Sequence, residues 1–353
     1  MSDNRIARII GARTLGSIAL ALFVMLAWMA ATLSPTAAQS IEEFYRGRTV
    51  TVVIGFSAGG GYDLYARLLA RHLGKHIPGQ PNVVPQNREG AGSERALLYL
   101  YNAAPKDGTV VGTFSRSMAV APLLVGAPFD ARKLSWLGSI SSDVSVCFTW
   151  YTSPIKTFAD MTEKPFTVAG LAKDADPDIF ALMLRNVFGA KLKLVSGYPG
   201  TNDATLAMER GEVNGVCGIS WSTAHARHMD WLTAHKVYMP VQLGLRKEPE
   251  ISEVPAVTDL AKTDEQRQMV RLILAGQAMA RPYAAPPGIP QDRYRALVAA
   301  FDATMKDPEF LADAAKLQAE VSPVTASEID RLLADVYATP KPIVVKAAQA
   351  IAN

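Results

Sequence analysis

The residues best suited to chemistry form one short run in which an apolar segment leads into a serine, three glycines and an aspartate. The run reads Gly55-Phe56-Ser57-Ala58-Gly59-Gly60-Gly61-Tyr62-Asp63 and follows the β-branched segment 49–54. Glycines between a strand and a helix let a ligand approach the backbone, and the unpaired N–H groups and positive dipole end of the helix attract an anion. The run therefore predicts an anion-binding loop.

The same run contains Gly-x-Ser-x-Gly at residues 55–59, the elbow that carries the nucleophile in serine hydrolases. That elbow normally follows several strands, yet Ser57 comes soon after the end of a predicted signal peptide at Ala38. A catalytic triad of this type also needs a histidine late in the chain, and the last histidine here is His235. The pattern therefore favours a serine that hydrogen-bonds a ligand or its own turn, and a hydrolase using Ser57 is the remote alternative.

Residues 1–38 have the three parts of a secretory signal, with arginines, then an apolar run, then small residues ending at Ala38. We expect cleavage near Ala38 and a periplasmic protein, and an uncleaved membrane anchor is the alternative. Removing this segment deletes three arginines and Asp3, so the formal charge falls from +3 to +1. A nearly neutral chain gives no electrostatic case for binding nucleic acid or a membrane surface.

The chain has two cysteines, Cys147 and Cys217, each in a β-like run. An oxidising compartment makes a disulfide between them possible, and two buried free thiols that pack as small apolar residues are the other interpretation. Neither cysteine has a second cysteine or a histidine at metal-binding spacing, so we expect no metal site. No motif indicates a cofactor.

Strand-like and helix-like segments alternate along the first half of the chain, which predicts a mainly parallel sheet flanked by helices. In such sheets the loops at the carboxyl ends of the strands lie at one edge, where ligands bind. We expect three loops to meet there, namely Ser57–Asp63, Asn87–Ser93 and Ser115–Ser117. A second set of such units begins near residue 143, and its Gly197–Asp203 loop again leads into a helix. The C-terminal helices carry no chemical motif.

Several short motifs, taken in order, resemble one family over nearly all of the chain that follows the signal peptide. They are Ala58-Gly59-Gly60-Gly61-Tyr62-Asp63 with Ala66-Arg67-Leu68-Leu69-Ala70, then Asn87-Arg88-Glu89-Gly90-Ala91-Gly92, Ala104-Pro105-Lys106-Asp107-Gly108-Thr109, Leu137-Gly138-Ser139-Ile140, Tyr198-Pro199-Gly200, Gly211-Glu212-Val213-Asn214 and Glu253-Val254-Pro255-Ala256-Val257-Thr258-Asp259-Leu260. The chain resembles the Bug family, the periplasmic receptors of tripartite tricarboxylate transporters.

The resemblance implies a two-lobed type II periplasmic binding fold with a hinge between the lobes and a ligand in the cleft. It implies residues 39–142 plus 276–353 as lobe 1 and residues 143–275 as lobe 2. It also implies a monomer that captures a small organic carboxylate and delivers it to the membrane permease subunits of a secondary transporter; a sensor subunit for a membrane kinase is the alternative. The expected ligand-binding residues are Phe56, Ser57, Gly59, Gly60, Gly61, Tyr62, Asp63, Asn87, Ala91, Gly92, Ser93, Ser115, Arg116, Ser117, Tyr198, Thr201, Asn202 and Asp203.

The chain departs from the family pattern in features that bear on the ligand. Ala58 replaces the usual proline, and the acidic segment 170–177 replaces a loop rich in glycine and threonine in lobe 2. Arg116 lies at a strand end in a site that the family builds from backbone groups. Its guanidinium either pairs with a ligand carboxylate, which we favour, or bridges to an acid of the other lobe.

Overall fold

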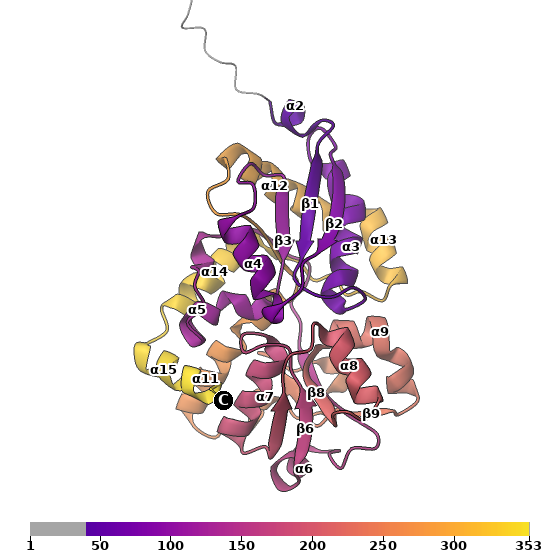
Figure 1. The fold of residues 1–353 in the computed structure, drawn as a ribbon, viewed down its shortest axis with the longest axis vertical. Coiled ribbons are helices and arrows are strands. Elements are labelled where there is room, and N and C mark those ends of the chain that lie inside the picture. The colour runs from indigo at the N-terminus through magenta and orange to yellow at the C-terminus, as the bar shows by residue number, and fades with distance from the viewer. Residues whose placement is uncertain (1–39, 353) are drawn as a thin grey trace, which may run out of the picture. The chain divides into compact units, whose positions relative to one another are not determined.

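The computed structural model describes residues 40–352 as two α/β halves, each built around its own sheet. The predicted signal peptide, residues 1–38, lies outside the described residues. Figure 1 shows β1, β2 and β3 in one half and β6 and β8 in the other, and we call the two halves lobe 1 and lobe 2. The predicted chain boundaries of the lobes remain a proposal.

Lobe 1 is organised around a sheet with the strand order β12-β4-β11-β3-β1-β2. Strand β1 is flanked by parallel β2 and β3, and its last residue Ile54 lies opposite Asn87 and Thr113. This register ends the three strands at one edge and brings together the loops that follow them, as the sequence predicts. The strands are β1 (Thr49–Ile54), β2 (Asn82–Asn87), β3 (Val110–Thr113), β4 (Ser135–Ser139), β11 (Pro282–Ala285) and β12 (Val324–Thr325).

Helices cover this sheet because their apolar faces match its buried strands. In α3, Tyr65 and Leu69 are buried in one cluster with Val50 and Val52 of β1. The start of α14 has a capping box, in which Thr325 and Glu328 bond each other's backbone N–H groups. The helical elements are α2 (Ile41–Tyr45), α3 (Gly61–Leu73), η1 (Gly74–His76), η2 (Ala91–Ser93), α4 (Glu94–Asn102), η3 (Arg116–Ala119), α5 (Ala121–Leu124), η4 (Ala131–Lys133), α12 (Gln291–Thr304), α13 (Pro308–Lys316) and α14 (Ala326–Tyr337).

Lobe 2 has a sheet with the order β10-β5-β8-β6-β7, and β9 pairs with β5. Its strands are β5 (Ser145–Trp150), β6 (Phe166–Ala169), β7 (Leu192–Val195), β8 (Gly215–Ser220), β9 (Val237–Tyr238) and β10 (Gln242–Leu243). Its helical elements are α6 (Phe158–Glu163), α7 (Asp176–Phe188), α8 (Thr201–Glu209), α9 (Trp221–Thr233), η5 (Pro249–Ile251), α10 (Val257–Leu260), α11 (Asp264–Ile273) and η6 (Ala275–Met279).

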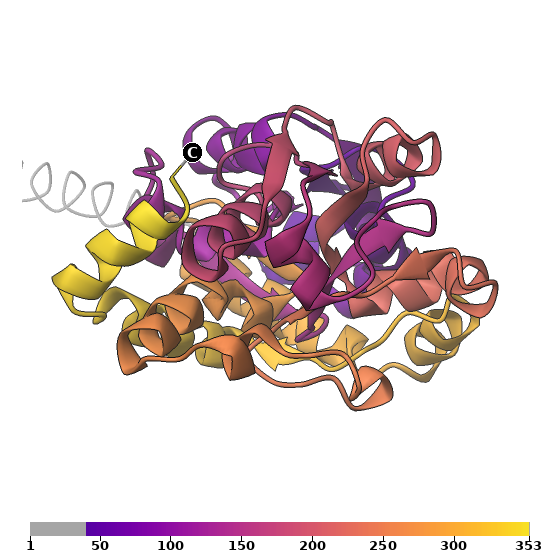
Figure 2. The ribbon, with the colours of Figure 1, turned by 90° about the horizontal axis from the view of Figure 1, so that it is seen from below.

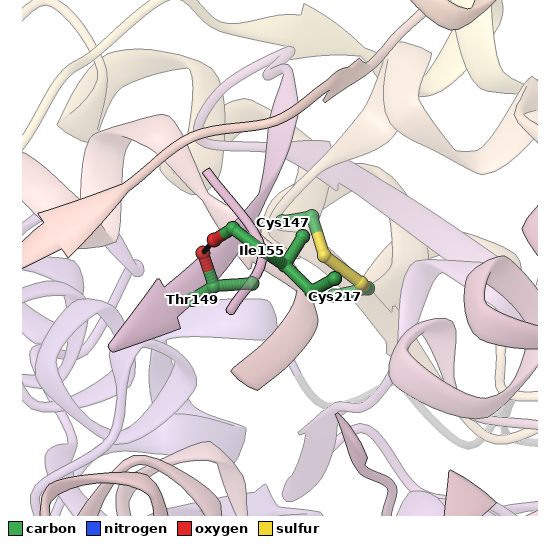
Figure 3. Close-up of a disulfide and its surroundings, with 4 residues drawn as sticks. All are labelled: Cys147, Thr149, Ile155 and Cys217. Carbon is green, nitrogen blue, oxygen red and sulfur yellow. Dashed lines mark hydrogen bonds between the residues drawn. A yellow bond between two sulfur atoms is a disulfide. The ribbon is translucent and has the colours of Figure 1, made fainter. Parts of the chain in front are cut away.

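A disulfide joins the neighbouring strands β5 and β8 of lobe 2 (Figure 3). The two strands pair antiparallel with Cys147 opposite Cys217, so the Cα atoms are 3.8 Å apart and both sulfurs lie in the buried core. Near the bridge, the Thr149 hydroxyl donates to the carbonyl of Ile155 at 2.6 Å and holds the loop that follows β5.

Two chain segments that connect the lobes lie side by side and are joined by backbone hydrogen bonds. Ala280 donates to Ser141 at 2.8 Å, and Asp143 donates to Gln277 at 3.0 Å. The C-terminal helix α15 (Lys341–Ala350) packs on α11, and Figure 2 shows it in yellow beside the orange segment that contains α11. It is also tied to the end of α7, where Asn186 Nδ2 donates to the carbonyl of Ala350 at 3.0 Å.

The predicted α/β fold class is confirmed. The sheets are more mixed than the predicted mainly parallel arrangement, because β11 runs antiparallel to both β3 and β4, and β5 runs antiparallel to β8. These strands follow the connections between the lobes, so they do not belong to the β-loop-α repeats that the sequence shows. Within residues 40–352, none of the helices has the length and apolar character needed to cross a membrane.

Candidate functional site

The glycine-rich loop between β1 and α3 is held by a carboxylate of the protein itself. Gly59 has φ +89°, a conformation that favours glycine, and its N–H donates to Asp63 Oδ2 at 2.9 Å. Asp63 also accepts from Arg67 Nε at 2.9 Å and from Asn87 Nδ2 at 2.9 Å. Burial alone raises the pKa of Asp63, but these hydrogen bonds outweigh it and hold the pKa below its usual value. The Asp63 carboxylate therefore fixes the conformation of the loop through hydrogen bonds within lobe 1.

Asn87, at the end of β2, fixes the same loop from the opposite side. Its amide nitrogen donates to the carbonyl of Phe56 at 2.9 Å as well as to Asp63, and its Oδ1 accepts from Arg67 Nη2 at 2.7 Å. Both ends of the Asn87 amide are thus bonded within lobe 1.

The loop that follows β2 contains consecutive residues in left-handed backbone conformations. Gly90, Ala91, Gly92 and Ser93 have φ values of +128°, +47°, +58° and +85°. Ser93 is fully buried, and its hydroxyl accepts the N–H of Ser115 at 2.8 Å. A Cβ atom placed on Gly92 would lie 2.7 Å from that of Ala175, so this loop packs closely against lobe 2.

The first turns of α3 in lobe 1 and α8 in lobe 2 face each other. The Ser57 hydroxyl donates to Asp203 Oδ2 at 2.8 Å across the lobes. A Cβ on Gly60 would lie 3.3 Å from Thr201 Oγ1, and one on Gly59 would lie 3.9 Å from Asn202. The glycines therefore allow two helix N-termini to approach, and both carry the positive end of a helix dipole.

A cavity of about 30 Å³ lies beside these turns. Helices α3, α7, α8 and α9 all begin at it, so their unpaired N–H groups and positive dipole ends add to one another. Lobe 1 contributes two arginines to the wall. The lining residues are Phe56, Gly61, Tyr62, Ser115, Arg116 and Arg281 from lobe 1 and Leu171, Ala175, Asp176, Pro177, Thr201, Gly218, Ile219, Ser220 and Thr223 from lobe 2.

Arg116 is buried in the wall of the cavity and connects the lobes. Its Nε lies 2.5 Å from Asp176 Oδ2, and its Nη2 donates to the Ser145 hydroxyl at 2.6 Å. Of the two roles considered for Arg116, the structure shows the bridge to an acid of the other lobe, and the favoured ligand contact stays a prediction. Within residues 40–352, the buried Nη1 has no hydrogen-bond partner.

Arg281, between η6 and β11, is a second buried cation that the sequence analysis missed. Its Nη1 donates to the Ser220 hydroxyl at 3.1 Å and its Nη2 to the Thr223 hydroxyl at 2.7 Å, both in lobe 2. Its Nε has no partner among the described residues. No local motif marks Arg281, because the contacts that define its role lie about sixty residues away along the chain.

Tyr62 joins the two arginines. Its ring lies 4.9 Å below the Arg281 guanidinium and stacks on Phe56, and its hydroxyl accepts the backbone N–H of Arg116 at 3.0 Å. Burial raises the pKa of Tyr62, so the phenol keeps its proton at neutral pH. The hydroxyl can therefore act as a donor toward the cavity.

The acidic segment 170–177 and the start of α7 place carboxylates at the boundary between the lobes. Asp178 accepts from the N–H groups of Leu171 and Ala172 and so fixes the backbone of the segment. Asp174 is buried, and neither of its carboxylate oxygens has a hydrogen-bond partner in the described part of the chain. Burial and the nearby Glu94 carboxylate raise the pKa of Asp174 to about 7.

A separate cluster on lobe 1 brings His72, Asp307 and Glu309 close enough to share a metal ion. The Lys75 ammonium lies 2.5 Å from Asp307 and 2.6 Å from Glu309, so it already pairs with both carboxylates. This cluster is therefore accounted for as a network of ion pairs.

The chain was compared with known proteins, and no family model matches it. It is 25% identical over 245 residues to a UPF0065 protein in the TAR-I ttuE-ttuC′ intergenic region of Agrobacterium vitis, covering 65% of this chain. It is 32% identical over 115 residues to a UPF0065 protein of Bordetella bronchiseptica, covering 32% of this chain. The matches span 66% of the length of the first relative and 33% of the second.

Similar solved structures cover 86% of the chain. They include the periplasmic binding protein BugD (20% identity, TM-score 0.67, 97% of that chain covered) and MatC of Rhodopseudomonas palustris with bound malate (20%, 0.66, 99%). A third is Rpa4515 of R. palustris with adipate (16%, 0.66, 97%). The chain has the Bug-type periplasmic binding fold. The resemblance noted in the sequence is thereby confirmed at the level of the fold.

In this Bug-type fold, only part of the predicted ligand-binding set lines the cavity, namely Phe56, Gly61, Tyr62, Ser115, Arg116 and Thr201. The other predicted residues lie around it and hold the loops or the contact between the lobes. Ser117, for example, donates to the Asp174 carbonyl at 2.6 Å, and the Tyr198 N–H donates to the Gly170 carbonyl at 3.2 Å. This supporting group is Ser57, Gly59, Gly60, Asp63, Asn87, Ala91, Gly92, Ser93, Ser117, Tyr198, Asn202 and Asp203.

Proposed function

We propose that this protein is a periplasmic solute receptor that captures a small organic carboxylate between its lobes and delivers it to the permease subunits of a tripartite tricarboxylate-type transporter. One observation carries the proposal: the cavity combines the starts of four helices with the partnerless Arg116 Nη1 and Arg281 Nε within the described chain. Buried donors without acceptors are unfavourable, and an anion would satisfy them.

The relatives support an anionic ligand. The structures with bound malate and with adipate have the same fold, and both ligands are dicarboxylates. Their fold belongs to binding proteins, which argues against an enzyme. The Ser57 hydroxyl donates to a carboxylate, Asp203, and so has the contact of a residue that holds the lobes together.

Capture requires the lobes to separate and close again. The ligand carboxylate first meets the N-terminus of α3 and Arg116 on lobe 1. Closure then brings the N-termini of α7, α8 and α9 to the ligand, with the 140–144 and 274–281 segments as the hinge. Each lobe alone offers only part of the donor set, so the ligand stabilises the closed form.

A thermal-shift screen of the protein without residues 1–38 tests the binding step, because a ligand that binds the folded state raises the melting temperature. The panel contains mono-, di- and tricarboxylates and aromatic acids, with neutral sugars as controls. We expect at least one carboxylate and no sugar to raise the melting temperature. A response to sugars alone, or to nothing, would contradict the proposal. Uptake of the labelled ligand by cells with and without this gene tests delivery.

A further inference from the structure

The cavity wall has a surplus of hydrogen-bond donors. Arg116 Nη1 and Arg281 Nε have no partner within residues 40–352, although the two residues are only 2% and 1% exposed. The nitrogens of a guanidinium group carry hydrogens and offer no acceptor, so these groups can only donate.

The hydroxyl groups of the wall add further donors. The Tyr62 hydroxyl accepts from the Arg116 backbone, while the Ser220 and Thr223 hydroxyls each accept from Arg281. A hydroxyl carries one hydrogen as well as its lone pairs, and none of the hydrogen bonds described for this part of the chain uses the hydrogens of these three groups. They can therefore turn toward a ligand in the cavity.

Acceptors are scarce on the same wall. Asp176 is its only carboxylate, and Arg116 Nε already pairs with Oδ2. Ser117 donates to the Asp174 carbonyl, so the short Ser115–Ser117 contact has Ser115 as donor and leaves the Ser115 oxygen as an acceptor. Arg281 also forms an ion pair with the buried Asp143, whose Oδ2 lies 3.8 Å from Nη2, so the charges of the two arginines are balanced by Asp176 and Asp143. The surplus at the cavity is therefore one of hydrogen-bond donors and not of charge.

From this imbalance we propose that the receptor selects organic acids without an ammonium group and rejects the amino acids of the same skeleton. The inference rests on the proposed function and narrows its ligand class. A carboxylate supplies acceptors to the unpaired donors, whereas an ammonium group brings three more donors to a wall that already lacks acceptors for its own. The discrimination resides in Arg116, Arg281 and Tyr62.

Calorimetric titration of the wild-type protein with matched pairs tests the inference. The pairs are malate and aspartate, 2-oxoglutarate and glutamate, adipate and 2-aminoadipate, and phenylpropionate and phenylalanine. In each pair that binds, we expect the amino acid to bind more weakly by on the order of tenfold to a hundredfold, the effect of one unsatisfied buried polar group. Tighter binding of the amino acid would overturn the inference and leave the receptor function intact. Binding of neither member in every pair would overturn the proposed function as well.

Two variants distinguish the loss of one hydrogen-bond donor at the cavity from a general loss of structure. Tyr62→Phe keeps the ring that stacks on Phe56 and removes the hydroxyl, so we expect acid binding to weaken by about tenfold. The matched control is Tyr294→Phe, whose hydroxyl donates to the Trp136 carbonyl away from the cavity. Equal affinities in Tyr62→Phe and the control would overturn the donor argument. A weakening confined to Tyr62→Phe supports it.

Discussion

Arg116 of lobe 1 and Asp176 of lobe 2 form a buried ion pair in which Nε and Oδ2 are 2.5 Å apart. The pair lies in the wall of the cavity, so the carboxylate of the protein lies where a ligand carboxylate would compete for the same guanidinium. A buried pair gains little net free energy after desolvation, but leaving one partner alone is unfavourable. The strength of this contact between the lobes therefore depends on the charge of the ligand in the cavity.

Asp176→Asn is expected to lower the stability of the unliganded protein and to raise its affinity for an anion. Removing the carboxylate leaves Arg116 uncompensated, which lowers the free energy of unfolding by about 2 kcal/mol, and a bound carboxylate restores the lost partner. The ligand-induced rise in melting temperature should thus exceed that of the wild type. Asp264→Asn, which loses an exposed contact to Arg267, is the control and should change little. A smaller ligand-induced rise in Asp176→Asn would show that Asp176 assists the ligand.

Asp174 should make the folded protein less stable as the pH rises. Its pKa is about 7 in the folded protein, against 3.8 without burial, so between these values the folded state binds more protons than the unfolded state. Stability contributed by the protonated form is therefore lost as the pH rises toward and through 7. Burial is the largest cause of the raised pKa; among the neighbouring charges, Glu94 and Asp178 raise the pKa and Lys173 lowers it.

Asp174→Asn mimics the protonated form and should remove this pH dependence. We expect the free energy of unfolding at pH 8 to rise by about 1–3 kcal/mol, with a much smaller change at pH 5. Urea denaturation at both pH values measures the effect, and the exposed Asp259→Asn serves as control. Equal effects at pH 5 and pH 8 would argue against a buried, protonated Asp174.

Asp63 should have the opposite effect to Asp174, so that its contribution to stability is lost as the pH falls. Its pKa lies below 3.8 in the folded protein, so the stability from its bonds to Gly59, Arg67 and Asn87 is present above that value and is lost as the pH falls. Asp63→Asn is expected to lower the free energy of unfolding by about 1–2 kcal/mol at pH 7. The difference from wild type should shrink in acid, and a difference that grows instead would refute the assignment.

The disulfide should stabilise lobe 2. It closes a loop with a sequence separation of 70 residues, for which chain entropy gives about 4 kcal/mol. We expect the Cys147→Ala, Cys217→Ala double variant to show a markedly lower urea midpoint than the oxidised protein. Reductant should lower the midpoint of the wild type and leave that of the double variant unchanged. Equal midpoints for both proteins under oxidising conditions would contradict a bridge.

Local sequence signals predicted the elements that border the cavity. The β-branched run before the glycines became β1, and Gly189 ends α7 with φ +75°, as a glycine after a helix should. The three loops of lobe 1 meet because parallel strands in register end together. These features depend on neighbouring residues, so the sequence carries them.

The polar wall of the cavity depends on contacts between distant segments and was predicted only in part. Arg281 has no motif around it and acquires its role only when lobe 2 packs against it. Asp63 and Asn87 are expected at the ligand, which stays a prediction, and the structure shows in addition that they bond each other and the loop backbone. A sequence shows that an aspartate lies at the start of a helix. It does not show whether the carboxylate accepts hydrogen bonds from N–H groups of the protein or from a ligand.

The most direct test of the central claim is a calorimetric titration of the best carboxylate from the screen into wild type and Gly61→Ala. Alanine suits the first turn of α3, but its Cβ would lie 2.3 Å from Thr223 Oγ1 of lobe 2, so the lobes could not close. The account predicts tight binding to wild type and at least tenfold weaker binding to Gly61→Ala, with the fold retained by circular dichroism. Undiminished binding to Gly61→Ala would contradict capture of the anion between the lobes.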